Sequence, residues 1–175
     1  CFMKNISLID EDFMDFPIGE FPYDKNHSAT GEYHFIHYPG FYGRWYDPVC
    51  NYRYNGQGAS WCIMEYNGRH YMEQMRLHNT EPHRTFPTLE TGDRFWRDYD
   101  IEAGLRMFNT KWGSAGIGFC AQNSLNILAC IFEDKKLKLV YRHKENVEEI
   151  KSVDFDYNCD DIYNIKVSVK GSHVI

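Results

Sequence analysis

The 175-residue sequence lacks the features that would mark it as a membrane-spanning or nucleic-acid-binding protein. It has no run of about 18 apolar residues, the length that a membrane-spanning helix requires. Lys and Arg are scattered through a chain of net charge −6, so no basic stripe is available to contact a phosphate backbone. We therefore expect no membrane span and no nucleic-acid partner.

Metal-site and disulfide patterns are also missing. The six Cys residues form no C-x-x-C pair, and no His follows them at zinc-finger spacing, which argues against a structural zinc site. Six Cys in a chain of this length do not make a disulfide scaffold either. Cys62, Cys120 and Cys130 lie in apolar, strand-like segments, and we expect them to be buried free thiols.

Helical periodicity is absent as well, because no window of about a dozen residues has an apolar stripe at helical spacing. The nearest candidate, "NVEEIKSV" (146–153), stands between strand patterns. What the chain does contain is alternation with a period of two. "YDIEAGLRM" alternates in this way, and we predict a central strand over 98–107 with Ile101, Ala103 and Leu105 buried.

Further strands and turns follow from the same pattern. "YNIKVSVKG" alternates like 98–107, and residues 115–141 read as three strands with tight turns near 123–126 and 133–136. Asn67-Gly68 predicts a hairpin turn inside "ASWCIMEYNGRHYMEQMRLH". At least eight antiparallel strands in one domain (1–175) predict an all-β sandwich or jelly roll.

Aromatic residues make up 17% of the chain and concentrate in "HYPGFYGRWYDP" (37–48), inside the longest irregular region. Phe41 and Tyr42 stand beside glycines, and we expect them to anchor this loop. Trp45 and Tyr46 stand beside charged residues and are better candidates for a surface on which a sugar ring stacks.

The second half of the chain resembles the concanavalin A-like, laminin-G-like jelly rolls. The resemblance rests on the order of "DYDIEAGLRMF", "AGIGFCAQNSLNILACIF", "KLKLVYR" and "DDIYNIKVSVKGSHVI", and on "LIDEDFMDFPIGEFP" (8–22), which is similar to the first strand of such domains. It covers about two thirds of the chain. Residues 23–67 depart from the general pattern and look like an elaboration found in modules of bacterial polysaccharide-degrading proteins.

The resemblance implies a carbohydrate-binding module with a polysaccharide or oligosaccharide partner. A polysaccharide lyase or glycoside hydrolase with its site on the concave sheet face is the alternative, and a structural or interaction domain is a third interpretation. The implied location is extracellular or at the cell surface, and a cytoplasmic one stays open. For this chain alone, a non-catalytic role is favoured over an enzymatic one.

Two candidate catalytic patterns are incomplete. A retaining glucanase uses paired carboxylates, but Asp98, Asp100 and Glu102 lack the Glu–Asp–Glu order, and a solvated strand face explains them as well. A lyase needs a base and a group that neutralises a uronate. His70 and its neighbours in "RHYMEQMRLH" offer these, and a polar sheet face is again the alternative.

We expect a concave sheet face to read the glycan, with Arg recognising any carboxylate. The predicted ligand-binding residues are Trp45, Tyr46, Gln74, Arg76, His78, Glu102 and Arg106. The resemblance also implies that a structural Ca²⁺ could use Asp10 and Asp12; otherwise these residues belong to a charged terminus and no cofactor is needed.

The last residues, "VKGSHVI", predict a strand, a Gly-Ser turn and the start of another strand. A jelly roll that lacks its closing strands leaves an open edge. We therefore expect the chain to belong to a longer polypeptide, or a neighbouring domain or second chain to cover that edge.

Overall fold

The computed structural model of the chain describes residues 6–20, 28–30, 45–47, 61–74, 88–93, 95–108, 113–123, 125–144, 146–159 and 161–175. Within these ranges every regular element is a strand, and no helix is present that is long and apolar enough to cross a membrane. The strands are β1 (Gly19–Glu20), β2 (Ser28–Thr30), β3 (Trp45–Asp47), β4 (Trp61–Tyr66), β5 (Arg69–Gln74), β6 (Asp100–Arg106), β7 (Ala115–Asn123), β8 (Asn126–Glu133), β9 (Lys136–His143), β10 (Asn146–Asp154), β11 (Ile162–Lys170) and β12 (His173–Val174).

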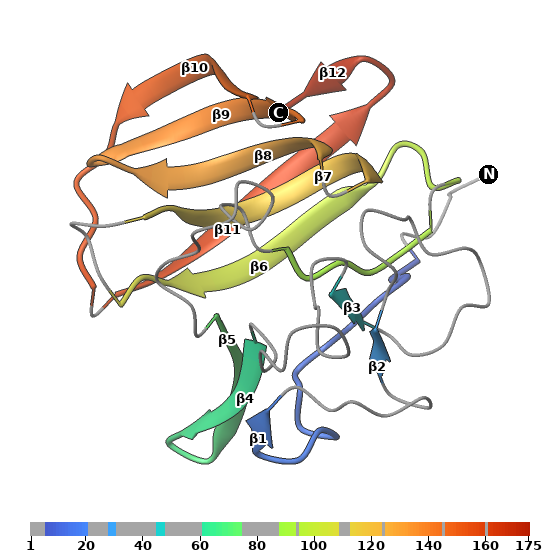
Figure 1. Cartoon of the computed structure of the whole chain (residues 1–175), viewed down its shortest axis with the longest axis vertical. Coiled ribbons are helices and arrows are strands. Elements are labelled where there is room, and N and C mark those ends of the chain that lie inside the picture. Colours follow the sequence, from blue (N-terminus) through green and yellow to red (C-terminus); the bar gives the residue numbers. More distant parts are fainter. Residues whose placement is uncertain are drawn as a thin grey trace.

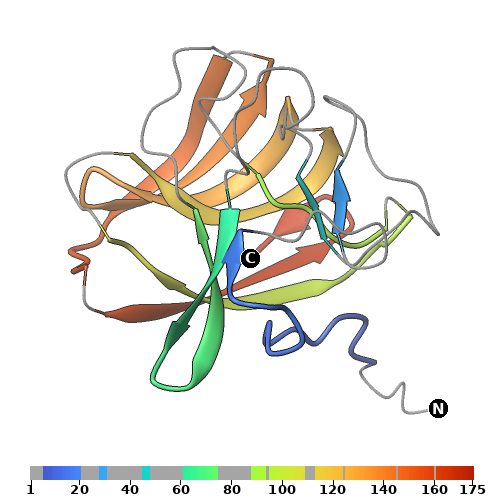
Figure 2. The same cartoon turned by 60° about the horizontal axis from the view of Figure 1, so that its bottom comes forward.

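The main body consists of two antiparallel sheets, which Figure 2 shows as two layers. One sheet has the strand order β10-β9-β8-β7 and the other has the order β12-β11-β6 (Figure 1). Between them lies the main core, whose buried members are Met107, Ile117, Phe119, Phe132, Tyr157, Ile165, Val167 and Val169. The all-β prediction is confirmed at this level, and the arrangement is consistent with a β-sandwich.

Alternation along β6 and β11 decides which side chains enter the core. Ile101, Ala103 and Leu105 are half-buried and pack against it, and their partners across the pair include buried Ile165 and Val167. The predicted inner face is therefore correct. Among the described strands, β6 does not have the predicted central position, because it pairs with β11 alone, whereas β11 pairs with both β6 and β12.

The predicted turns are confirmed. Asn67 and Gly68 connect β4 to β5 with φ values of 52° and 73°, the left-handed conformation that a two-residue hairpin turn requires. The turn between β8 and β9 consists of Asp134 and Lys135, with φ values of 52° and 59°. The segment that came nearest to a helical pattern is β10, an edge strand paired with β9.

A second, smaller core forms where β1, β4 and β5 meet the N-terminal segment. Phe16 and Ile63 are buried there, and the half-buried or partly exposed residues packed against them are Phe13, Trp45, Trp61, Met72 and Leu89. The strand expected within 8–22 is reduced to β1, because Phe16 N–H donates to the carbonyl of Phe13 and closes a turn before it. β2 and β3 pair in parallel, unlike the antiparallel pairing expected throughout.

The described cysteines Cys62, Cys120, Cys130 and Cys159 are free thiols. Cys62 is buried, and burial raises the pKa of its thiol, as it does for half-buried Cys130. The prediction that Cys120 is buried is wrong. It is exposed and has a φ of 51° where the pairing of β7 with β8 becomes irregular, and its thiol lies 3.7 Å from the Tyr99 hydroxyl.

The C-terminal residues fold as the sequence predicts. β11 turns at Gly171 into β12, and Val169 pairs with Val174. Ile175 continues the pairing through two backbone hydrogen bonds with Ser168. Whether a longer polypeptide or another chain covers an edge stays a prediction.

Replacing Phe132 with Ala tests the core assignment. The Phe132 ring lies 5.3 Å from the rings of Tyr157 and Tyr163 and 5.6 Å from that of Phe155, measured between centroids. Phe132→Ala should lower the free energy of unfolding by about 3–5 kcal/mol in a denaturant melt. Phe95→Ala, at a ring that is 62% exposed, should change it by less than about 0.5 kcal/mol. Equal losses in the two variants would contradict the assignment.

Candidate functional site

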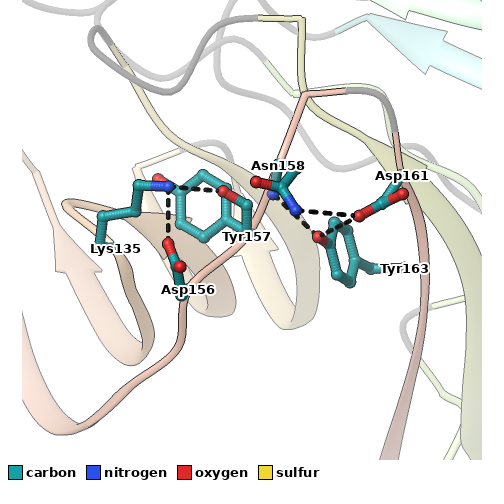
Figure 3. Close-up of polar contacts among 6 residues, drawn as sticks. All are labelled: Lys135, Asp156, Tyr157, Asn158, Asp161 and Tyr163. Atoms are coloured by element: carbon teal, nitrogen blue, oxygen red, sulfur yellow. Dashed lines mark hydrogen bonds and ion pairs between the residues drawn. The ribbon is translucent and has the colours of Figure 1, made fainter.

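The site begins with the connection that leaves β10 in one sheet and reaches β11 in the other, residues 155–161. Phe155 N–H donates to the carbonyl of Lys135. The Lys135 ammonium lies 2.8 Å from the Asp156 carboxylate and donates to the carbonyl of Tyr157 at 2.7 Å (Figure 3). The bond that Lys135 donates to Asp156 is the main reason that the pKa of Lys135 is raised. These contacts tie the start of the connection to the β8–β9 turn.

The end of the connection is held by a second set of hydrogen bonds, also visible in Figure 3. The Tyr163 hydroxyl accepts a bond from Asn158 N–H at 2.9 Å and donates to the Asp161 carboxylate at 3.2 Å. The Asn158 amide donates to the same carboxylate at 3.2 Å. The backbone of this connection is therefore fixed at both ends, and with it the carbonyl of Cys159.

That carbonyl holds Arg106, the last residue of β6. Arg106 Nε donates to the Cys159 oxygen at 3.2 Å. The guanidinium lies 5.6 Å from the centroid of the Tyr66 ring and 5.3 Å from that of Phe108, within cation–π range of both. The two rings remain 58% and 55% exposed. We call Tyr66, Arg106 and Phe108 the ring platform.

Strand parity explains how these residues meet. Arg106, the last residue of β6, is on the outer side of the strand, opposite to Leu105, and Phe108 continues this parity two residues beyond the strand end. Tyr66 is the last residue of β4, where the Asn67-Gly68 turn begins. Tyr71 lies on the same face of this hairpin as Tyr66. Burial raises the pKa of Tyr71, and the nearby positive charge of Arg106 lowers it.

A polar strip continues from the ring platform along the outer face of β6 and β11. It consists of Asp100, Glu102, Asn164 and Lys166, with Gly104 opposite Asn164. A Cβ at Gly104 would meet Asn164 Oδ1 and Ile162 Cγ2 at 3.3 Å, so glycine keeps this part of the strip flat. The strip offers carboxylate acceptors, an amide and an ammonium in a row.

The electrostatics of the strip bear on catalysis. A hydrogen bond from Ser168 holds the pKa of Asp100 below its ordinary value, and Lys166, 3.5 Å away, acts in the same direction. The general acid of a glycosidase needs the opposite shift, a raised pKa. Asp100 is therefore suited to accepting hydrogen bonds from hydroxyl groups rather than to donating a proton. The Asp98 carboxylate is engaged in a structural hydrogen bond, which it accepts from Gly171 N–H at 2.7 Å.

Of the predicted ligand-binding residues, the fold brings Glu102 and Arg106 to one face. Gln74 pairs with Trp61 and lies on the hairpin face that carries Ile63 and Met72, opposite to the face of Tyr66. Gln74 and Arg106 therefore approach different sides of the hairpin. Arg76 and His78 lie outside the described residues.

The aromatic loop has a packing role at Trp45. Its ring lies 5.5 Å from that of Phe13 in the second core, and its indole N–H donates to the Glu11 carboxylate at 3.0 Å. Trp45 is half-buried and engaged in these contacts, unlike the free surface position that the sequence suggested. The backbone of Tyr46 is in β3, and its side chain, like Phe41 and Tyr42, lies outside what the structure describes.

The predicted calcium ligands are at the N-terminal segment. Asp10 is exposed, and the Asp12 carboxylate accepts a bond from Met14 N–H at 3.0 Å. Within the described ranges, no three His, Cys, Asp or Glu side chains gather in a way that could hold a metal ion. A calcium site stays a prediction.

The sequence-based prediction missed Tyr66 and Phe108. Both carry a local signal, since Tyr66 precedes the Asn-Gly turn and Phe108 continues the outward parity of Arg106. Their proximity depends on tertiary structure, which alternation alone does not give. Comparison of the chain with family models, with curated proteins and with solved structures finds no match in any of the three.

Arg106→Ala tests whether the guanidinium holds the platform together. The variant loses two cation–π contacts and the bond to Cys159, and we expect a loss of about 1–2 kcal/mol in the free energy of unfolding. Lys170→Ala, on the exposed face of β11, is the control. Denaturant melts with identical losses for the two variants would show that Arg106 holds nothing in place.

Proposed function

We propose that this chain is a non-catalytic carbohydrate-binding module, a sandwich of the concanavalin A-like jelly-roll type from a bacterial polysaccharide-degrading protein. Its ligand is a polysaccharide or oligosaccharide that lies across the ring platform and the polar strip. The observation that supports this proposal best is the platform itself, two exposed rings bracketing one guanidinium. An extracellular or cell-surface location fits such a ligand.

The chemistry of the two parts matches the two kinds of surface on a sugar. The C–H face of a pyranose is apolar and stacks on an aromatic ring, while its hydroxyl edge needs hydrogen-bond partners. Tyr66 and Phe108 provide the rings. Hydrogen-bond partners lie beside the rings. Glu102 provides an acceptor and Lys166 a donor, while the Asn164 amide can both donate and accept.

Preorganisation adds to this argument. A bound ligand costs less conformational entropy when the side chains that receive it are already ordered. Arg106 contacts both rings and is itself held by the Cys159 carbonyl. The platform therefore keeps its shape without a ligand.

A lyase or glycoside hydrolase is the alternative. The lowered pKa of Asp100 counts against this residue as the general acid of a glycoside hydrolase, because that acid must be protonated. Release of new reducing ends from an added oligosaccharide would favour a glycoside hydrolase, and release of unsaturated uronate products would favour a lyase.

Binding should be measured by calorimetry with hexasaccharides of β-1,4-glucose, β-1,4-xylose, β-1,3-glucose and galacturonate. With whichever hexasaccharide binds, Tyr66→Ala and Phe108→Ala should each weaken the affinity about fivefold to tenfold, because each removes one stacking surface. Phe95→Ala is the matched control, since Phe95 is also an exposed ring. If all three variants bind as the unmodified chain does, the platform is not the site; if no polysaccharide binds, the proposed function is wrong.

A further inference from the structure

The edge strand β10 has the properties of a surface that pairs with a second molecule. We propose that two copies of this chain associate by antiparallel pairing of β10 with β10 across a twofold axis. Within the described residues, β10 pairs on one side only, with β9. Eight of its nine residues are exposed, and Ser152 is the one that is half-buried. An edge strand this open presents unpaired backbone groups to a partner.

The apolar content of the edge points to an interface rather than to a solvated border. Val147 and Ile150 are 53% exposed and Val153 is 50% exposed. Phe155, directly after the strand, is 36% exposed. Val147 and Val153 lie on opposite faces of the strand, so each face of this open edge carries an exposed apolar side chain, which a solvated edge strand avoids.

Charge identifies the partner as a second copy. The pairing with β9 is irregular between Glu149 and Lys151, and this bulge places Glu148 and Lys151 on the same face, opposite Tyr141 and Leu139 of β9. Neither charge forms an ion pair with any residue that the structure describes. On the other face, Glu149 accepts a bond from Ser152 and lies 3.8 Å from Lys138.

A twofold axis between Glu149 and Ile150 pairs each of Asn146, Val147 and Glu148 with a residue of the second copy whose side chain is on the same face. Glu148 then lies opposite Lys151 of the second copy, and symmetry produces this pair twice. Asn146 lies opposite Val153, and Val147 lies opposite Ser152. The Glu148–Lys151 pair is therefore complementary to itself in charge, which favours a second copy over an unrelated strand.

The size of the contact limits its strength. A single pair of nine-residue strands buries less than the roughly 1,200 Å² of a standard stable interface, so the dimer should be weak and reversible. The bulge and the charges disfavour pairing with strands that lack the matching pattern.

Sedimentation of the full 175-residue chain tests the proposal. Over concentrations from about 1 to 300 μM, the unmodified chain should shift reversibly from monomer to dimer. Glu148→Lys places like charges opposite each other twice and should raise the dissociation constant about tenfold or more. The double variant Glu148→Lys/Lys151→Glu restores both pairs in reverse and should recover the dimer.

Lys170→Glu also reverses one charge, but on β11 of the other sheet, and should leave the association unchanged. A chain that stays monomeric throughout this range overturns the proposal. A dimer that the single and double variants weaken equally also overturns it, because the contact then does not pair Glu148 with Lys151. A thermal melt of each variant checks folding, which these exposed positions should not disturb.

Discussion

The connection between β10 and β11 is the constraint on which both the sandwich and the candidate site depend. It must leave one sheet and enter the other, and it does so with Tyr157 fully buried beneath the Lys135 ammonium. Phe132 packs on Tyr157 from the core side. The carbonyl of Cys159 in the same connection holds Arg106, so the contacts that close the core also set the position of the exposed rings.

Alternation predicts much of this fold because the inner faces of β6 and β11 meet an apolar core and their outer faces do not. The same parity is enough to place Glu102 and Arg106 on one face of their strand. Asn-Gly identifies its hairpin because both residues adopt the left-handed conformation that a two-residue turn requires. These features depend on local sequence, which is why sequence is sufficient for them.

Features that depend on contacts between distant segments could not be predicted. Alternation assigns Lys138 and Arg142 to the outer side of β9, yet they are only 9% and 2% exposed, beside the buried residues Ala129 and Val140. Burial lowers the pKa of Arg142. The same limit applies to the ring platform, where Tyr66 meets Arg106 although 40 positions separate them in the sequence numbering (106 minus 66).

The two proposed surfaces belong to different sheets: the one proposed for self-association is β10, and the one proposed for a sugar includes the outer side of β6. Such a division would let a dimer engage a polymer at two points and gain avidity. The most direct test of sugar binding at the ring platform is an aromatic NMR titration with the neutral hexasaccharides. We predict that the ring resonances of Tyr66 and Phe108 shift while those of buried Phe132 and Tyr157 do not. Shifts confined to Trp45 and Tyr46, with Tyr66 and Phe108 unmoved, would contradict the proposed site.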